Sequence, residues 1–105
     1  MDAAIKELSD QMHKLFLEIM QKDPWEPGYG EVVAIHEFLS KVLRDKAQKG
    51  MDEFSSYLTT AAEEINETWQ SNKSMLKNWS TQLKPVFEIV ERITKNAVPL
   101  LRLIL

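Results

Sequence analysis

Residues 51–105 read MDEFSSYLTTAAEEINETWQSNKSMLKNWSTQLKPVFEIVERITKNAVPLLRLIL, and their apolar side chains recur in one seven-residue register. Two columns of residues, spaced alternately by four and three positions, hold fourteen apolar residues out of sixteen. This spacing puts both columns on one side of a helix, and it is typical of helices that pack along another helix as in a coiled coil. The columns are Met51, Leu58, Ile65, Asn72, Trp79, Val86, Ile93 and Leu100, and Ser55, Ala62, Trp69, Leu76, Leu83, Val90, Ala97 and Ile104.

Two prolines interrupt this stretch. Pro85 has no amide hydrogen for an intrahelical bond and disfavours the helical conformation at Lys84, so we expect a kink or a break near 81–85. Pro99 has the same effect near the end of the stretch. We therefore expect a long helix over about 51–83, followed by a kinked or turned helix over about 85–98. The polar run 71–74 offers the alternative, a break that gives helices of more equal length.

Asn72 is the polar member of the first column. A polar residue at a core position of a helical seam can fix the register and the number of chains, at a cost in stability. Asn72 is therefore a candidate register-setting residue. The alternative is that the seam is open there, so that Asn72 meets solvent or marks a turn.

The residues before 51 predict two shorter helices joined by a loop. Apolar residues at 5, 8, 12, 15 and 19 predict a helix over about 3–22, and those at 32, 35, 39 and 42 predict a helix over about 31–49. The loop 23–30 reads DPWEPGYG, in which proline and glycine favour turns. Its Trp25 and Tyr29 either cover the open end of the helical core or present an aromatic contact to a partner.

These elements predict a single all-α domain over residues 1–105, a three- to four-helix bundle with coiled-coil-like packing and a long, Pro-kinked C-terminal helical region. The domain is either independent or the N-terminal part of a longer protein. A helix over 51–83 would be about 50 Å long against about 30 Å for its partners, so its excess apolar surface predicts self-association through residues 65–104. The apolar tail, residues 100–105, either docks into the bundle, meets another protein or enters a membrane surface.

The composition excludes several kinds of chemistry. The 105 residues include no Cys and two His, so disulfides, thiolate metal sites and a cysteine nucleophile are excluded. The sequence has no glycine-rich phosphate loop and no Glu-x-x-His pair of the di-iron bundles, and His36 is expected to flank a helix stripe. The net charge of −3 excludes bulk attraction to nucleic acid. We expect that the protein is not an enzyme and that it has no catalytic, cofactor-binding or metal-binding residue.

The sequence therefore predicts a cytoplasmic, non-enzymatic module for protein–protein interaction or self-assembly, of the adaptor, regulatory or signalling type. It shows no signal peptide and no stretch long enough to span a bilayer. The alternative is peripheral binding to a membrane or lipid surface by segment 73–105, which combines an apolar stripe with six basic residues. The candidate partner-contact residues are Trp25, Tyr29, Trp79, Phe87, Leu100, Leu101 and Ile104.

Overall fold

Helices make up all the regular secondary structure of the described residues. The computed structural model of the chain describes residues 3–45, 50–94 and 98–105, and no strand occurs among them. The all-α class predicted from the periodicity is confirmed. The elements are α1 (Ala3–Met20), α2 (Tyr29–Asp45), α3 (Met51–Trp69), the 3₁₀ turn η2 (Gln70–Asn72), the single turn α4 (Lys73–Leu76), the 3₁₀ turn η3 (Lys77–Trp79), α5 (Ser80–Ile93) and the 3₁₀ turn η4 (Leu100–Leu103).

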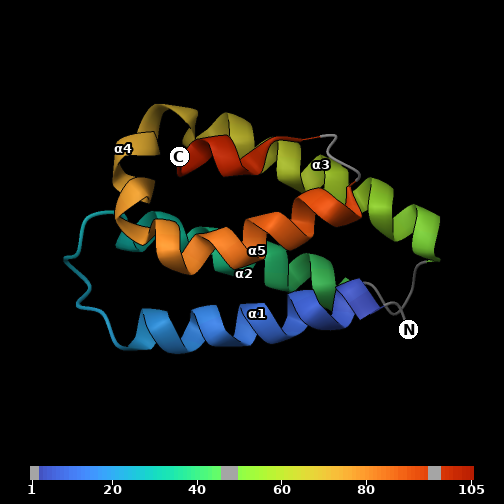
Figure 1. Cartoon of the computed structure of the whole chain (residues 1–105), viewed down its shortest axis with the longest axis horizontal. Coiled ribbons are helices and arrows are strands. Elements are labelled where there is room, and N and C mark those ends of the chain that lie inside the picture. The colour runs from blue at the N-terminus through green and yellow to red at the C-terminus, as the bar shows by residue number, and fades with distance from the viewer. Residues whose placement is uncertain (1–2, 46–49, 95–97) are drawn as a thin grey trace.

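The four longer helices alternate in direction along one long axis (Figure 1). α1 packs against α2 and α5, while α3 packs against α2, α5 and η4. The molecule measures 39 × 25 × 17 Å and has a radius of gyration of 13.0 Å. That radius is expected of a compact domain of about 100 residues.

The first two helices bury the stripes that their spacing predicts. α1 ends at Met20, two residues before the predicted boundary, and α2 begins at Tyr29, two residues before its own. The predicted end of the second helix, at 49, lies outside the described residues. The predicted end of the fourth helix, at 98, is wrong, because α5 ends at Ile93 and Thr94 has φ of −81° and ψ of 2°, outside the α region. The buried residues of the two stripes are Ile5, Leu8, Met12, Leu15 and Ile19 on α1, and Val32, Ile35, Leu39 and Val42 on α2.

The two seven-residue columns point inward, as expected of apolar residues that need a partner surface. Trp69 is half-buried, and the side chains of Met51 and Ala97 lie outside the described part of the chain. The other apolar members are buried: Leu58, Ala62, Ile65, Leu76, Trp79, Leu83, Val86, Val90, Ile93, Leu100 and Ile104.

The predicted long helix over 51–83 is wrong, because the chain reverses between α3 and α5 (Figure 1). Trp69, Asn72 and Trp79 have φ between −104° and −114° and ψ between 6° and 24°, outside the α region. The residues between them stay helical or 3₁₀, so the apolar spacing continues while the helix axis changes direction. The alternative break at 71–74 lies within this reversal.

Pro85 lies inside α5 and does not end it, so the predicted break near 81–85 is also wrong, while the alternative of a kink there stays a prediction. Because α5 begins at Ser80, Pro85 is its sixth residue and removes one donor of the backbone ladder. The carbonyl that loses this donor belongs to Thr81, which is exposed and can be hydrated. The helix therefore continues to Ile93.

The C-terminal tail docks onto the helices. Val98, Leu100, Leu103 and Ile104 are buried, and η4 packs against α3 and α5. The backbone N–H of Leu101 donates to Glu91 Oε2 at 2.6 Å. α3 has 19 residues, close to the 18 of α1 and the 17 of α2, so the length mismatch that predicted self-association does not arise.

Candidate functional site

The loop between α1 and α2 is held against the reversal between α3 and α5. Trp79 Nε1 donates to the carbonyl oxygen of Pro27 at 2.9 Å. Gly28 has φ of +84°, and a Cβ atom built on it would lie 2.6 Å from the Met75 carbonyl oxygen. Tyr29 meets the Trp79 ring edge-on at 6.2 Å between centroids. Tyr29 therefore covers the end of the core, while the loop is fixed at Pro27 and Gly28.

The seven candidate contact residues do not form one surface. The side chains of Trp79, Phe87, Leu100 and Ile104 belong to the chain's own core, because each is at most 5% exposed. Tyr29 and Leu101 are half-buried. Trp25 is the exposed member of the set. The folded chain thus covers four of the seven residues that the sequence assigned to a partner.

Asn72 does not lie on a straight helical seam. It is the last residue of η2, is half-buried, and directly precedes α4 in the reversal. This position agrees with the alternative expectation of a turn.

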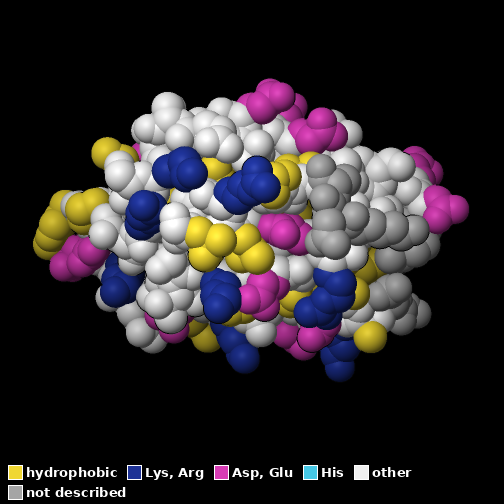
Figure 2. Space-filling view, turned by 45° about the horizontal axis from the view of Figure 1, so that its top comes forward, with side chains coloured by type: hydrophobic (Ala, Val, Ile, Leu, Met, Phe, Trp, Pro, Cys, Tyr) yellow, Lys and Arg dark blue, Asp and Glu magenta, His cyan; other side chains and the backbone are white. Residues whose placement is uncertain are grey.

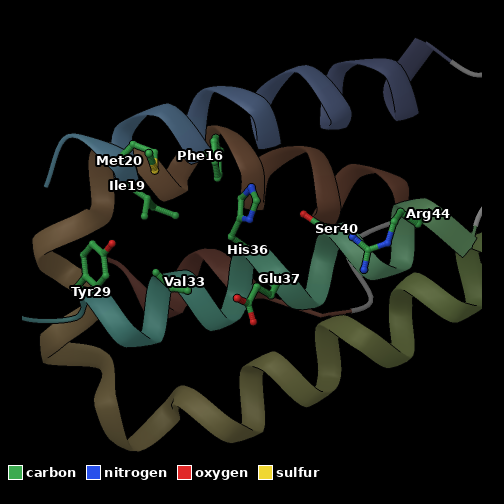
Figure 3. Close-up of a pocket in the computed structure, with 9 residues that line it drawn as sticks. All are labelled: Phe16, Ile19, Met20, Tyr29, Val33, His36, Glu37, Ser40 and Arg44. Carbon is green, nitrogen blue, oxygen red and sulfur yellow. The ribbon is translucent and has the colours of Figure 1, made fainter. Parts of the chain in front are cut away.

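A groove runs between α1 and α2 (Figure 3). One cavity of about 490 Å³ extends from Met20 and Tyr29 to Arg44. A second cavity of about 290 Å³ shares four of its lining residues and extends to Ser9 and Leu43, so the two form one continuous groove. We call this the α1–α2 groove. The larger cavity is lined by Phe16, Ile19, Met20, Tyr29, Val33, His36, Glu37, Ser40 and Arg44.

His36 connects the two walls of the groove. Its Nε2 lies 3.1 Å from the carbonyl oxygen of Met12, and a carbonyl only accepts, so Nε2 carries the hydrogen. Its ring also lies 5.7 Å from the ring of Phe16. The imidazole points from α2 toward α1 in Figure 3. Because Nε2 is engaged in this bond, His36 acts here as a cross-brace between the helices.

Two exposed apolar side chains, Phe16 and Met20, line this groove, and two more follow them closely in the chain, Leu17 on α1 and Trp25 in the loop before α2. Phe16, Leu17, Met20 and Trp25 are 44%, 47%, 67% and 80% exposed, and all lie within ten consecutive residues. We call these four residues the apolar rim. The face of the molecule in Figure 2 shows its hydrophobic side chains in separate patches among charged ones. The apolar rim and the groove together form the candidate site.

Two charged residues flank the groove on α2. Glu37 and Arg44 are exposed and line the larger cavity. Neither forms an ion pair or a side-chain hydrogen bond with another described residue. Elsewhere, Arg92 on α5 pairs with Glu7 on α1 at 2.8 Å. Glu37 and Arg44 are therefore available to pair with charges of an external partner.

Tyr57 on α3, which does not line the groove, has a raised pKa. Its hydroxyl donates to Asp45 Oδ2 at 3.1 Å. This hydrogen bond, together with burial and the negative charges of Asp45 and Glu64, raises the pKa of Tyr57 above its ordinary value. The bond stabilises the fold while the phenol is protonated, and that stabilisation is lost as the pH rises through the raised pKa.

Of the predicted contact residues, Tyr29 lines the groove, and Phe16 and Met20 were not predicted as contacts. The sequence does carry a signal for them, because both widen the apolar stripe of the first helix on one side. The groove itself needs two helices, and Glu37 and Arg44 carry no signal until α2 is placed beside α1. In the described ranges, no three His, Asp or Glu side chains lie close enough to share a metal ion. No helix there is both long and apolar enough to cross a bilayer.

Comparisons with protein-family models, with curated proteins and with solved structures find no match for this chain.

Proposed function

We propose that this helical bundle is a non-enzymatic protein-interaction module, of the adaptor or regulatory type, that binds a partner protein through the α1–α2 groove. The observation that supports the proposal most is that two large apolar side chains lining the groove, Phe16 and Met20, are 44% and 67% exposed. A soluble domain rarely leaves large apolar side chains together in water, and where it does they mark interaction surfaces. Trp25 at the end of the rim is of the residue type that most often anchors such contacts.

The groove is preorganised for binding. Its floor includes Ile19, which belongs to the core, and its two walls are joined by the bond from His36 to Met12. The loop that carries Trp25 is fixed at Pro27 by Trp79. A surface that is already ordered loses little conformational entropy when a partner binds.

The proposal differs from the two uses considered for the C-terminal part of the chain, self-association through residues 65–104 and membrane binding by residues 73–105. Both depended on the apolar stripe of this part being available outside the chain. In the folded chain the stripe residues Leu76, Leu83, Val86 and Val90 are fully buried. We therefore place the interaction on α1 and α2.

Affinity capture with matched variants tests the proposal. The intact chain is immobilised as the wild type, as Met20→Glu and as Met75→Glu, and each is exposed to an extract of the source cells. Met20 and Met75 are both exposed, at 67% and 43%, but only Met20 lines the groove. A charge at Met20 would have to be desolvated under a partner. We expect a protein that the wild type and Met75→Glu retain and that Met20→Glu loses.

Circular dichroism of all three forms serves as the folding control. Equal retention by Met20→Glu and the wild type would contradict the proposal, and so would equal loss in both variants.

A further inference from the structure

The α1–α2 groove has the length of a partner helix. On α2 its lining extends from Tyr29 to Arg44, and on α1 it extends from Ser9 to Met20. Fifteen residues of helix rise about 22 Å, so the α2 wall matches about four turns of an added helix. A helix laid between two helices buries an apolar stripe with the spacing i, i+3 or i+4, and i+7. The apolar side chains Phe16, Met20 and Val33 are placed to meet such a stripe.

Glu37 and Arg44 add a charge requirement to the apolar stripe of the added helix. Glu37 and Arg44 are seven residues apart on α2, which is two helical turns, or about 10 Å. Residues at this spacing lie on nearly the same side of a helix. An added helix running along α2 would meet Glu37 and Arg44 with two of its own residues that are also two turns apart.

We infer that the α1–α2 groove binds an amphipathic helix of another protein, one that places a Lys or Arg beside Glu37 and an Asp or Glu, two turns away, beside Arg44. The inference rests on the proposed function and names the class of partner. Apolar contacts would supply most of the affinity, while the two charge pairs would select the partner and its direction.

A second copy of this chain fits the groove less well. In an antiparallel pair related by a twofold axis across the middle of the groove, the midpoint of Tyr29 and Arg44 falls beside Glu37. The two copies of Glu37 would then lie next to each other at the axis. Like charges held together in an interface oppose association.

Two synthetic peptides test the inference. Each has about 18 residues and the same leucine stripe, and each carries one Lys and one Glu two turns apart along a single edge. The peptides differ only in the order of Lys and Glu along the chain, and the opposite edge is uncharged. Fluorescence anisotropy measures the affinity of each peptide for the intact wild type and for the doubly reversed variant E37K/R44E. Only one order places the peptide Lys beside Glu37 and the peptide Glu beside Arg44. We therefore expect the wild type to bind that peptide about tenfold more tightly at low salt. We expect E37K/R44E to prefer the other.

Three results would overturn the inference. Equal affinity for both peptides, with Met20→Glu weakening both, would reject the charge selection but leave the groove as the interaction surface. Self-association of the wild type that Met20→Glu abolishes would assign the groove to a second copy. Peptide binding that Met20→Glu leaves unchanged would remove both the inference and the proposed function. Met75→Glu is the control and should bind both peptides as the wild type does.

Discussion

At the scale of single residues, Gly28 shows how one backbone position links separate parts of the chain. It precedes α2, and its carbonyl oxygen accepts the bond from the Val32 N–H at 2.9 Å. Its φ of +84° lies in the left-handed region, and its missing side chain leaves space for the Met75 carbonyl oxygen. The glycine thus lets the loop that carries Trp25 approach α4.

We expect Gly28→Ala to lower the free energy of unfolding by about 2 kcal/mol, because alanine is strained at this φ and its methyl group would meet Met75 backbone. Gly30→Ala is the matched control. A Cβ atom at Gly30 meets nothing within 4 Å, and alanine favours the helix, so stability should stay the same or rise by up to about 1 kcal/mol. Urea denaturation measures both. A Gly28→Ala variant as stable as Gly30→Ala would contradict this account of the loop.

At the scale of elements, the reversal between α3 and α5 shows what periodicity can and cannot reveal. The spacing of Leu58, Ile65 and Leu76 predicted buried helical residues, and these residues are buried. The change of direction depends on the backbone angles of Trp69, Asn72 and Trp79, which leave the seven-residue register intact. The prediction at Pro85 failed for a related reason. Pro85 removes one backbone bond from α5, and whether the carbonyl that loses it, on Thr81, is exposed to water depends on how α5 packs, which the spacing does not show.

The tail depends on α5 through Glu91, and this contact gives a second prediction. Glu91→Ala removes the carboxylate that accepts the Leu101 N–H at 2.6 Å. Since a hydrogen bond to a charged group contributes about 1.5–3 kcal/mol, stability should fall by roughly that amount. The Leu101 amide should also exchange its hydrogen faster, as nuclear magnetic resonance can measure.

Glu88→Ala is the control for the tail contact. Glu88 is exposed and lies 4.0 Å from Lys84, so its loss should change stability by less than about 0.5 kcal/mol. Exchange of the Leu101 amide at the wild-type rate in Glu91→Ala would show that the carboxylate does not hold the tail.

At the scale of the whole molecule, the described residues bury most of their apolar stripes against one another, while Phe16 and Met20 stay exposed along the α1–α2 groove. Trp79, Phe87, Leu100 and Ile104 looked available in the sequence because nothing in it showed which helices would cover them. For Trp25 the sequence left open whether the ring covers the core or is presented to a partner, and the residue is 80% exposed. The groove could not be predicted at all, because it exists only where α1 and α2 lie side by side. Its charged flank adds Glu37 and Arg44, which in the sequence resemble any solvated pair on a helix surface.

The most direct test of this account is to map where a helix binds. The intact chain, labelled with nitrogen-15, is titrated with the preferred Lys–Glu peptide while its backbone amide chemical shifts are followed. We predict that the largest shift changes fall on residues 9–20 and 29–44, the two walls of the α1–α2 groove. Changes that are largest on α3 or on the tail, residues 98–105, would contradict it.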